Sequence, residues 1–257
     1  MDECAAAGVR LIIVVGNSGH LRDPIFLSDV ARRSQMTVVA SAGHYREGFF
    51  PDAVTSQSVE ELTAEIVREI EHGIGETTVR AGAIAEIGMS GETATDAEKK
   101  TFAASAAAQA QTGVPLMTHT AQGVGWREQI DMLAAGGADL NRVVIGHMDC
   151  LDDHEAHVGV IESGAWLGFD RINSLRYQSD EVRAKRLVDL IDAGHGDRVV
   201  LSTDTAMVTR LSTRGGAGYM AVLTEFVPLL RQYGVSEEWI RRISVDNAWR
   251  FLAGRQT

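Results

Sequence analysis

The chain has 257 residues, of which 45% are hydrophobic; this length suits one barrel-sized domain or two small ones. Its 24 basic and 35 acidic residues give a formal net charge of −11, which argues against nucleic-acid binding because phosphate contacts need a positive face. The sequence has no run of about 18 apolar residues and no basic N-terminal region, and its two cysteines, Cys4 and Cys150, lie far apart. We therefore expect no membrane span, no secretory signal and no disulfide framework, and predict a cytoplasmic location.

Short β-branched runs alternate with helical patterns along the whole chain. Strands are expected at Val9–Val15, Thr37–Ala42, Ala81–Gly88, Val114–Thr120, Arg142–Met148, Trp166–Asp170 and Val199–Asp204. Helices are expected between them at Ser58–His72, Asp96–Gln111, Trp126–Ala135, Ser179–Ala193 and Ala217–Gln232. This alternation predicts a parallel sheet covered by helices. Because no linker or break in composition interrupts it, a single domain over residues 1–257 is predicted.

The number of expected strands is one short of a closed barrel. A (β/α)8 barrel of the TIM type needs eight strands, and seven are visible here. Residues Asp2–Gly8 resemble the C-terminal end of a helix, and the first visible strand follows them directly. We therefore interpret the fold as an α/β barrel of this type whose first strand is expected upstream of Met1. An open doubly wound sheet has the same alternation and is the alternative.

Four of the expected strands end in a side chain that can bind a metal ion. Glu86, His119, His147 and Asp204 each lie at or near the carboxyl end of a different strand. In a parallel barrel the carboxyl ends of all strands open onto one face, where active sites lie. Two imidazoles and two carboxylates that converge there predict a site for zinc or a similar divalent ion.

Each of these residues also has an ordinary explanation. A histidine at the end of a strand is more often a hydrogen-bonded core or surface residue, and an aspartate after a strand is commonly a helix cap. Four such residues at the ends of four different strands are hard to explain as caps. The metal-site hypothesis therefore depends on the set and not on any single member.

The segments "TGVPLMTHT", "RVVIGHMD", "WLGFDR" and "FVPLLRQYGVSEEWIRRISVDNAWRFL" resemble the phosphotriesterase-like family of the amidohydrolase superfamily, in the branch with the phosphotriesterase homology proteins. The resemblance covers nearly the whole chain. It implies a barrel whose fourth, fifth, sixth and eighth strands carry the ligands Glu86, His119, His147 and Asp204. It also implies one or two divalent ions, with zinc expected, a homodimer, and hydrolysis of a small lactone, carboxylic ester or phosphotriester.

The resemblance also implies roles for three residues. Asp204 would orient the attacking water and carry its proton to the leaving group. Arg171 and Tyr45, which both follow strand ends, would line the substrate pocket. Neither nucleic acid nor a membrane is expected as a partner.

Two departures from the family pattern affect the expected metal content. Many members have a carbamylated lysine on the fourth strand, where this chain has Glu86, as in the branch in which glutamate bridges the metals. Members also have a His-x-His pair on the first strand, and this chain has none. Glu86, His119 and His147 would complete one site, whereas a second ion would keep only Glu86 and Asp204, which is few ligands for tight binding.

The other histidines and Cys150 have weaker claims to a role in the site. His20 and His44 follow the first two expected strands, and we expect them near the mouth of the barrel as solvated or substrate-facing residues. His154 and His157 are expected at an exposed helix start. Cys150 has no evident base of its own and is interpreted as structural.

Two further hypotheses stay open. A TatD-like metal-dependent nuclease would have Glu-Ile-Gly on its fourth strand and Thr-Asp on its eighth, and Glu86–Gly88 and Thr203–Asp204 fit that pattern. The second hypothesis is an inactive, truncated barrel that binds metal weakly, and the missing first strand is the feature that supports it.

Overall fold

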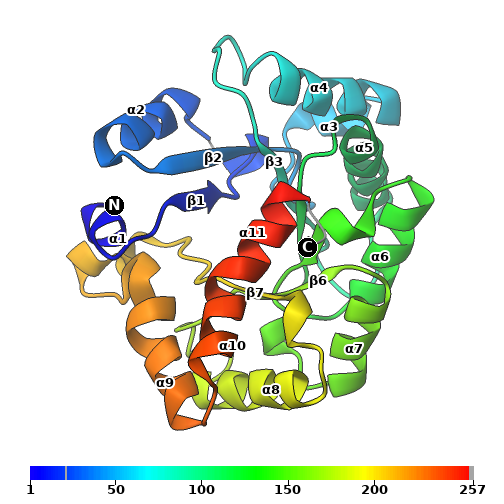
Figure 1. The fold of residues 1–257 in the computed structure, drawn as a ribbon. Coiled ribbons are helices and arrows are strands. Elements are labelled where there is room, and N and C mark those ends of the chain that lie inside the picture. Colours follow the sequence, from blue (N-terminus) through cyan, green and yellow to red (C-terminus); the bar gives the residue numbers. More distant parts are fainter. Residues whose placement is uncertain (21, 255–257) are drawn as a thin grey trace. The chain divides into compact units, whose positions relative to one another are not determined.

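The computed structural model describes residues 1–20 and 22–254, and it divides into two compact units at residue 143. The strands are β1 (Leu11–Val14), β2 (Thr37–Ala42), β3 (Ala83–Gly88), β4 (Leu116–His119), β5 (Val143–Ile145), β6 (Trp166–Phe169) and β7 (Val199–Leu201). The α-helices are α1 (Asp2–Ala6), α2 (Pro24–Ser34), α3 (Asp52–Ser56), α4 (Val59–Glu71), α5 (Asp96–Thr112), α6 (Trp126–Ala135), α7 (His154–Glu162), α8 (Asp180–Asp192), α9 (Val227–Gln232), α10 (Glu237–Arg241) and α11 (Asn247–Ala253). Strands and helices alternate along the chain as the sequence predicts (Figure 1).

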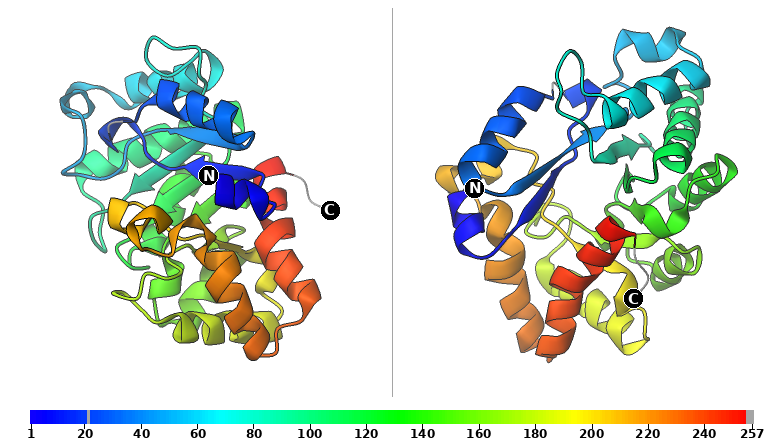
Figure 2. Two further views of the ribbon diagram at one scale, coloured as in Figure 1. Left: turned by 90° about the vertical axis from the view of Figure 1, so that its left-hand side faces the viewer. Right: turned by 45° about the horizontal axis from the view of Figure 1, so that its top comes forward.

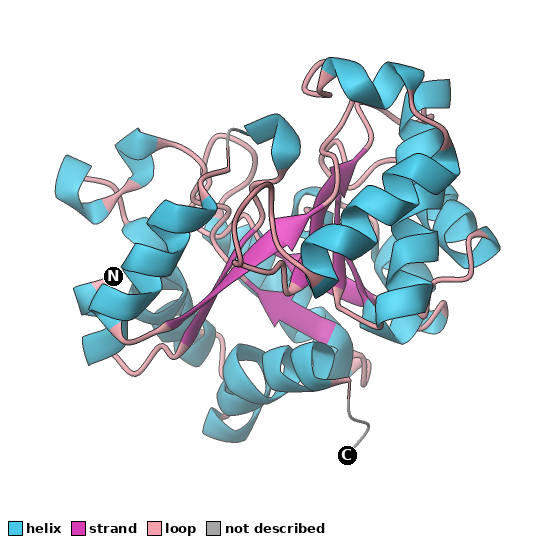
Figure 3. Ribbon diagram, turned by 90° about the horizontal axis from the view of Figure 1, so that it is seen from above, coloured by secondary structure: helices cyan, strands magenta, loops and turns pink. Residues whose placement is uncertain are grey.

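The N-terminal unit is built on β1 to β4, which pair in parallel and in chain order. Figure 3 shows the helices, strands and connecting loops of the chain by colour. Helix α4 begins at a capping box in which Ser58 and Glu61 satisfy each other's backbone N–H groups. Its Leu62 and Ile66, four residues apart, are buried, so this face of α4 belongs to the core. The same capping arrangement begins α5.

The C-terminal unit contains the parallel pairs β5–β6 and β6–β7. Helix α9 and the helical segment formed by α10 and α11 lie side by side in both views of Figure 2. The single helix expected at Ala217–Gln232 is divided into a 3-10 turn, a π-helical turn at Val222–Phe226 and α9. Pro228 explains this division, because it has no backbone N–H and its ring excludes a regular bond to the carbonyl four residues earlier.

All seven expected strands are confirmed as elements, although β5 and β7 end three residues earlier than expected. β5 and β7 stop before His147 and Asp204, because these residues have positive φ angles of 60° and 43° and leave the extended conformation. Within each unit the strand order follows the chain, without the reversal that defines a doubly wound sheet. The parallel α/β architecture is thus confirmed. An eighth strand is not among the described residues, so barrel closure and a single domain over 1–257 stay predictions.

Over the part of the chain that the structure describes, no helix is both long and apolar enough to cross a bilayer.

Candidate metal centre

Glu86 and His119 lie together in the N-terminal unit. They belong to the neighbouring strands β3 and β4, and Glu86 Oε1 is 3.5 Å from His119 Nδ1. Two ligand atoms that bind one tetrahedral zinc ion at its usual distances are roughly 3.4 Å apart. His119 is buried and Glu86 is half-buried, and both are among the side chains that could hold a metal ion. The spacing and chemistry of this pair therefore fit a shared divalent ion.

The main chain around His119 is held by its neighbours. Gln129 of α6, which is fully buried, donates a hydrogen bond from Nε2 to the His119 carbonyl at 2.8 Å. Gly88 leaves the space that His119 occupies, since a Cβ at Gly88 would lie only 2.9 Å from that of His119. These contacts fix the position of the imidazole at the end of β4.

Tyr45 lies against His119. Its hydroxyl oxygen is 3.1 Å from Nδ1 and 3.2 Å from Nε2 of His119, and the two rings meet edge to face. The ring of His20 also contacts Tyr45, with the two centroids 4.5 Å apart and the ring planes tilted by 47°. The structure therefore places both Tyr45 and His20 beside a predicted ligand.

The expectation for His44 was wrong. Its side chain is 3% exposed, and its Nδ1 lies 3.0 Å from the Ser18 hydroxyl. Burial, with a smaller contribution from the charge of Arg22, lowers the pKa of His44 to about 4. A neutral buried imidazole costs less than a charged one, so His44 is a core residue and not a solvated one.

His147 is held by Asp170 in the C-terminal unit. The carboxylate of Asp170 accepts the backbone N–H of His147 at 3.0 Å and lies 2.7 Å from its Nδ1. The left-handed backbone of His147 lets both nitrogens meet the same carboxylate. Gly168 makes room for this arrangement, because a Cβ there would lie 2.7 Å from Asp170 Oδ2. The Gly-Phe-Asp-Arg motif of the sequence thus has a structural reason.

A buried ion pair supports Asp170. Asp149 accepts the backbone N–H of Asp170 at 3.3 Å, and it pairs with Arg183 of α8 at 2.5 Å. Arg183 and the Asp149 side chain are fully buried, and Arg183 also pairs with Asp180 at 2.8 Å. Burial raises the pKa of Asp149 and the nearby carboxylate of Asp170 adds to the rise, whereas Arg183 opposes it. The network therefore connects a buried arginine to the ring of His147.

Asp204 pairs with Arg171. Asp204 Oδ2 is 3.4 Å from Arg171 Nε, and the guanidinium lies over the ring of Tyr177 at 4.1 Å from its centroid. Burial alone would lower the pKa of Arg171, but Asp204 and other anionic neighbours raise it. A permanent cation beside Asp204 favours the ionised carboxylate.

The remaining expectations have mixed outcomes. His157 was expected at an exposed helix start, but it is buried, with Nε2 2.8 Å from the Met148 carbonyl; His154 is exposed as expected. Cys150 is half-buried and desolvation raises its pKa to about 11, which suits a structural thiol.

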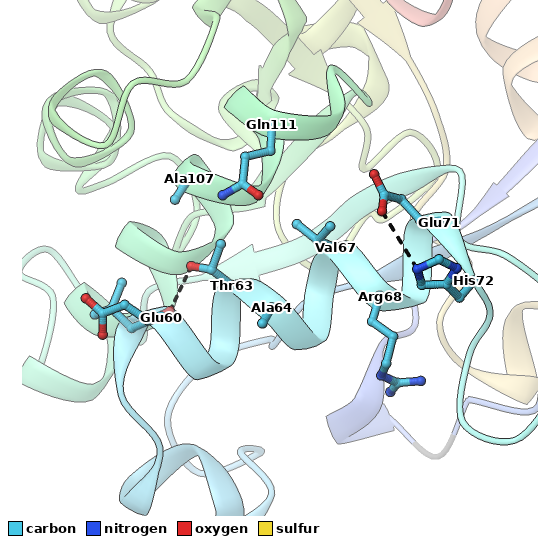
Figure 4. A pocket seen from close by; sticks show the side chains of 10 residues that line it. Glu60, Thr63, Ala64, Val67, Arg68, Glu71, His72, Ala107 and Gln111 are labelled. Atoms are coloured by element: carbon cyan, nitrogen blue, oxygen red, sulfur yellow. Dashed lines mark hydrogen bonds and ion pairs between the residues drawn. The ribbon is translucent and has the colours of Figure 1, made fainter.

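A surface groove along α4 and α5, lined by Val67, Ala107 and neighbouring residues, contains none of the predicted site residues (Figure 4).

Comparison with known proteins identifies a family for nearly the whole chain. Residues 1–252 match the model of the Phosphotriesterase family. The chain belongs to the phosphotriesterase family. It is 42% identical over 252 residues to the phosphotriesterase homology protein of Escherichia coli K12, covering 98% of this chain and 86% of that protein. It is 32% identical over 259 residues to the N-acetyltaurine hydrolase of Mus musculus, covering 96% of this chain and 74% of that protein.

Solved structures agree with this family assignment. The E. coli phosphotriesterase homology protein, complexed with phosphate in its active site, has a TM-score of 0.96 at 40% identity over 98% of this chain and 87% of that one. A resiniferatoxin-binding protein of Rhodobacter sphaeroides has a TM-score of 0.93 at 31% identity over 99% and 74% of the two chains. As a member of the phosphotriesterase family, the chain is an enzyme of the metal-dependent hydrolase type. This decides against the TatD-like nuclease.

Two residues beside the predicted ligands were missed in the sequence. Asp170 stands in the motif that drew attention to Arg171, and an acidic residue next to a strand end was the available signal. Asn17 is fully buried and donates hydrogen bonds to the main chain on both sides of Glu86. It has no comparable signal, because a single asparagine in a loop is ordinary.

Proposed function

We propose that the chain hydrolyses ester-type bonds, in a lactone, a carboxylic ester or a phosphotriester, with water activated at a divalent ion. Zinc is the expected ion, because imidazole and carboxylate ligands suit it. The observation that carries the proposal is the Glu86–His119 pair, whose ligand atoms are 3.5 Å apart at the ends of adjacent strands. Membership of the phosphotriesterase family supports the same chemistry.

We propose His147 as the third ligand of this ion. Its Nδ1 lies 2.7 Å from Asp170, and a carboxylate at that nitrogen selects the tautomer in which Nε2 would bind the metal. Metal-binding histidines are commonly oriented in this way. Under this proposal Asp170 acts on the metal only through His147.

The proposed roles of the other residues follow from their contacts. Asp204 would accept the proton of the attacking water and deliver it to the leaving group, and Arg171 would keep it ionised and in place. Tyr45, beside His119, would contact the substrate, as would Arg171. When bound, the divalent ion would polarise the scissile bond and lower the pKa of water. Glu86 and Asp204 would offer ligands to a second ion.

Amide hydrolysis is a second candidate. Relatives from five vertebrates and from Dictyostelium discoideum that are 31–32% identical to this chain are named N-acetyltaurine hydrolases. Amide and ester hydrolysis share an attack by water on an acyl carbon, so one site could serve both.

A homodimer, a cytoplasmic location and the absence of nucleic-acid and membrane partners also stay predictions.

The test is a substrate panel measured with and without metal. We expect purified chain to hydrolyse at least one among a lactone, a carboxylic ester, a phosphotriester and N-acetyltaurine. Chelation should abolish the activity, zinc should restore it, and His119→Ala should not respond to zinc. His72→Ala is the matched control, since His72 is an exposed histidine at the end of α4. Equal rates before and after metal removal would contradict the proposal.

A further inference from the structure

The strand that carries Glu86 is irregular at that residue. Ile84 pairs with Leu116, whereas Ile87 pairs with Thr118. Three residue steps on β3 therefore match two on β4, which is a bulge with one extra residue at Ala85–Glu86. Bulges re-aim side chains next to active sites, but they take peptide groups out of the ladder. Those buried groups need other partners.

The loop after β1 supplies these partners. The backbone N–H of Glu86 donates to the Val15 carbonyl at 2.8 Å. Asn17 Nδ2 donates to the Glu86 carbonyl at 3.0 Å and to the Ala85 carbonyl at 3.2 Å. Its Oδ1 accepts the N–H of Gly19 at 3.3 Å, which fixes the orientation of the amide. The main chain of Glu86 is thus held at both its N–H and its carbonyl.

This contact is not a consequence of strand pairing. β1 pairs with β2, and β2 pairs with β3, so the loop after β1 reaches past the end of β2 to contact β3. Asn17 is completely buried, and both hydrogen atoms of its amide nitrogen have an acceptor beside the bulge. No other residue type of that size offers two donors from one neutral atom.

We propose that Asn17 is a positioning residue for the metal ligand Glu86. By fixing the peptide groups before and after Glu86, it sets the direction of the carboxylate and so the affinity for the metal. The inference rests on the proposed function, which makes Glu86 a ligand. A role in stability alone is the competing explanation, because Asn17 also satisfies two buried carbonyls.

The chain offers a matched control for that explanation. Asn247 is also completely buried, and its Nδ2 donates to the carbonyls of Gly196 at 2.9 Å and Val199 at 2.8 Å. Val199 begins β7, at the opposite end of that strand from Asp204. Asn247 thus donates the same number of hydrogen bonds from its amide nitrogen at the same burial, but away from the predicted ligands.

The experiment compares Asn17→Ala, Asn247→Ala and Glu86→Gln with the wild type. Metal-free protein is titrated with Co²⁺ and followed by visible absorption, and the thermal unfolding of the same samples is recorded. We expect both asparagine variants to lower Tm, but only Asn17→Ala to weaken Co²⁺ binding, by about 10–100-fold. Asn17→Ser, which keeps one donor, should lie between Asn17→Ala and the wild type, and it serves if Asn17→Ala does not fold.

The outcomes separate this inference from the proposed function. Wild-type Co²⁺ affinity in Asn17→Ala and Asn17→Ser, with lost affinity in Glu86→Gln, would overturn the positioning role and leave the proposed function standing. Equal weakening in Asn17→Ala and Asn247→Ala would also overturn it, since the effect would then be one of general stability. Unchanged Co²⁺ binding in Glu86→Gln would contradict the proposed function itself, and the positioning role with it.

Discussion

In the N-terminal unit the predicted ligands are held through their main chain by neutral amides, Asn17 for Glu86 and Gln129 for His119. In the C-terminal unit His147 is held through its ring by the carboxylate of Asp170, which is backed by the buried Asp149–Arg183 pair. A neutral hydrogen bond contributes about 1 kcal/mol, whereas a buried charge left without its partner costs several. Substitutions that change the backbone geometry should therefore most affect the ligands of the N-terminal unit, and substitutions that remove a charge should most affect His147 in the C-terminal unit.

Each unit also contains a buried arginine–carboxylate pair that allows the comparison to be tested. Arg22 makes two hydrogen bonds to Glu69 at 2.7 and 2.9 Å in the N-terminal unit, and Arg183 pairs with Asp149 in the other. Among the hydrogen bonds described for residues 1–20 and 22–254, only those of the second pair lead to a predicted ligand. The two arginines thus separate the contribution of a buried ion pair to stability from its contribution to the metal site.

The largest effect is expected for Asp204→Asn. The amide cannot accept the proton of the attacking water, so kcat should fall by about 10²–10⁴-fold. Steady-state kinetics should show little change in KM, and metal analysis should show the ion bound by Glu86, His119 and His147 retained. A kcat within a few-fold of the wild type would remove Asp204 from the proposed chemistry.

Arg183→Met should destabilise the protein and weaken the metal site together. Removing one partner of a buried ion pair costs about 3–5 kcal/mol, because Asp149 is left as an uncompensated charge. Arg22→Met should cost a similar free energy of unfolding in urea titrations but leave Co²⁺ affinity unchanged. If Arg183→Met also kept wild-type affinity, the network would be structural only.

Asp170→Asn should weaken metal binding with a smaller loss of stability. The amide nearly preserves the shape of the side chain but loses the charge that orients His147, and such changes typically cost about 10–100-fold in affinity. Isothermal titration with zinc measures the effect. Asp152→Asn is a suitable control, because Asp152 is exposed and pairs only with Arg186 in the described contacts. Unchanged zinc affinity in Asp170→Asn would contradict the proposal that Asp170 orients His147 to bind the metal.

The smallest expected effect concerns His44 and acid. Its pKa is about 4 in the folded chain and about 6.5 when unfolded, so between these values the unfolded chain binds more protons and stability falls as pH falls. At pH 5 His44 should lower the free energy of unfolding by about 2 kcal/mol relative to pH 8. His44→Gln should reduce this pH dependence, and His72→Ala, at an exposed position, should not. An unchanged slope in His44→Gln would contradict the pKa.

The sequence predicts well where local pattern decides the structure. The expected strand at Thr37–Ala42 and the expected helix at Trp126–Ala135 match β2 and α6 residue for residue, because glycines bound α6 on both sides and β2 is a short, largely apolar run that ends before Gly43. The family motifs also identify Glu86 and His119, which the structure brings together.

Contacts that depend on backbone irregularity could not be predicted in this way. Asp170 reaches both nitrogens of His147 because His147 has a positive φ and Gly168 has no side chain. Asn17 reaches Glu86 because β3 contains a bulge that no residue pattern marks. His44 was misjudged for a related reason, since burial depends on packing and not on its position after a strand.

The measurement that tests the central claim most directly is the metal content of purified protein after dialysis. The account predicts at least one equivalent of zinc in the wild type, and its loss in both His119→Ala and His147→Ala, because both residues are proposed as ligands of one ion. His72→Ala should keep the wild-type content. A wild type without bound metal when zinc is supplied, or a full equivalent retained in His147→Ala, would contradict the account.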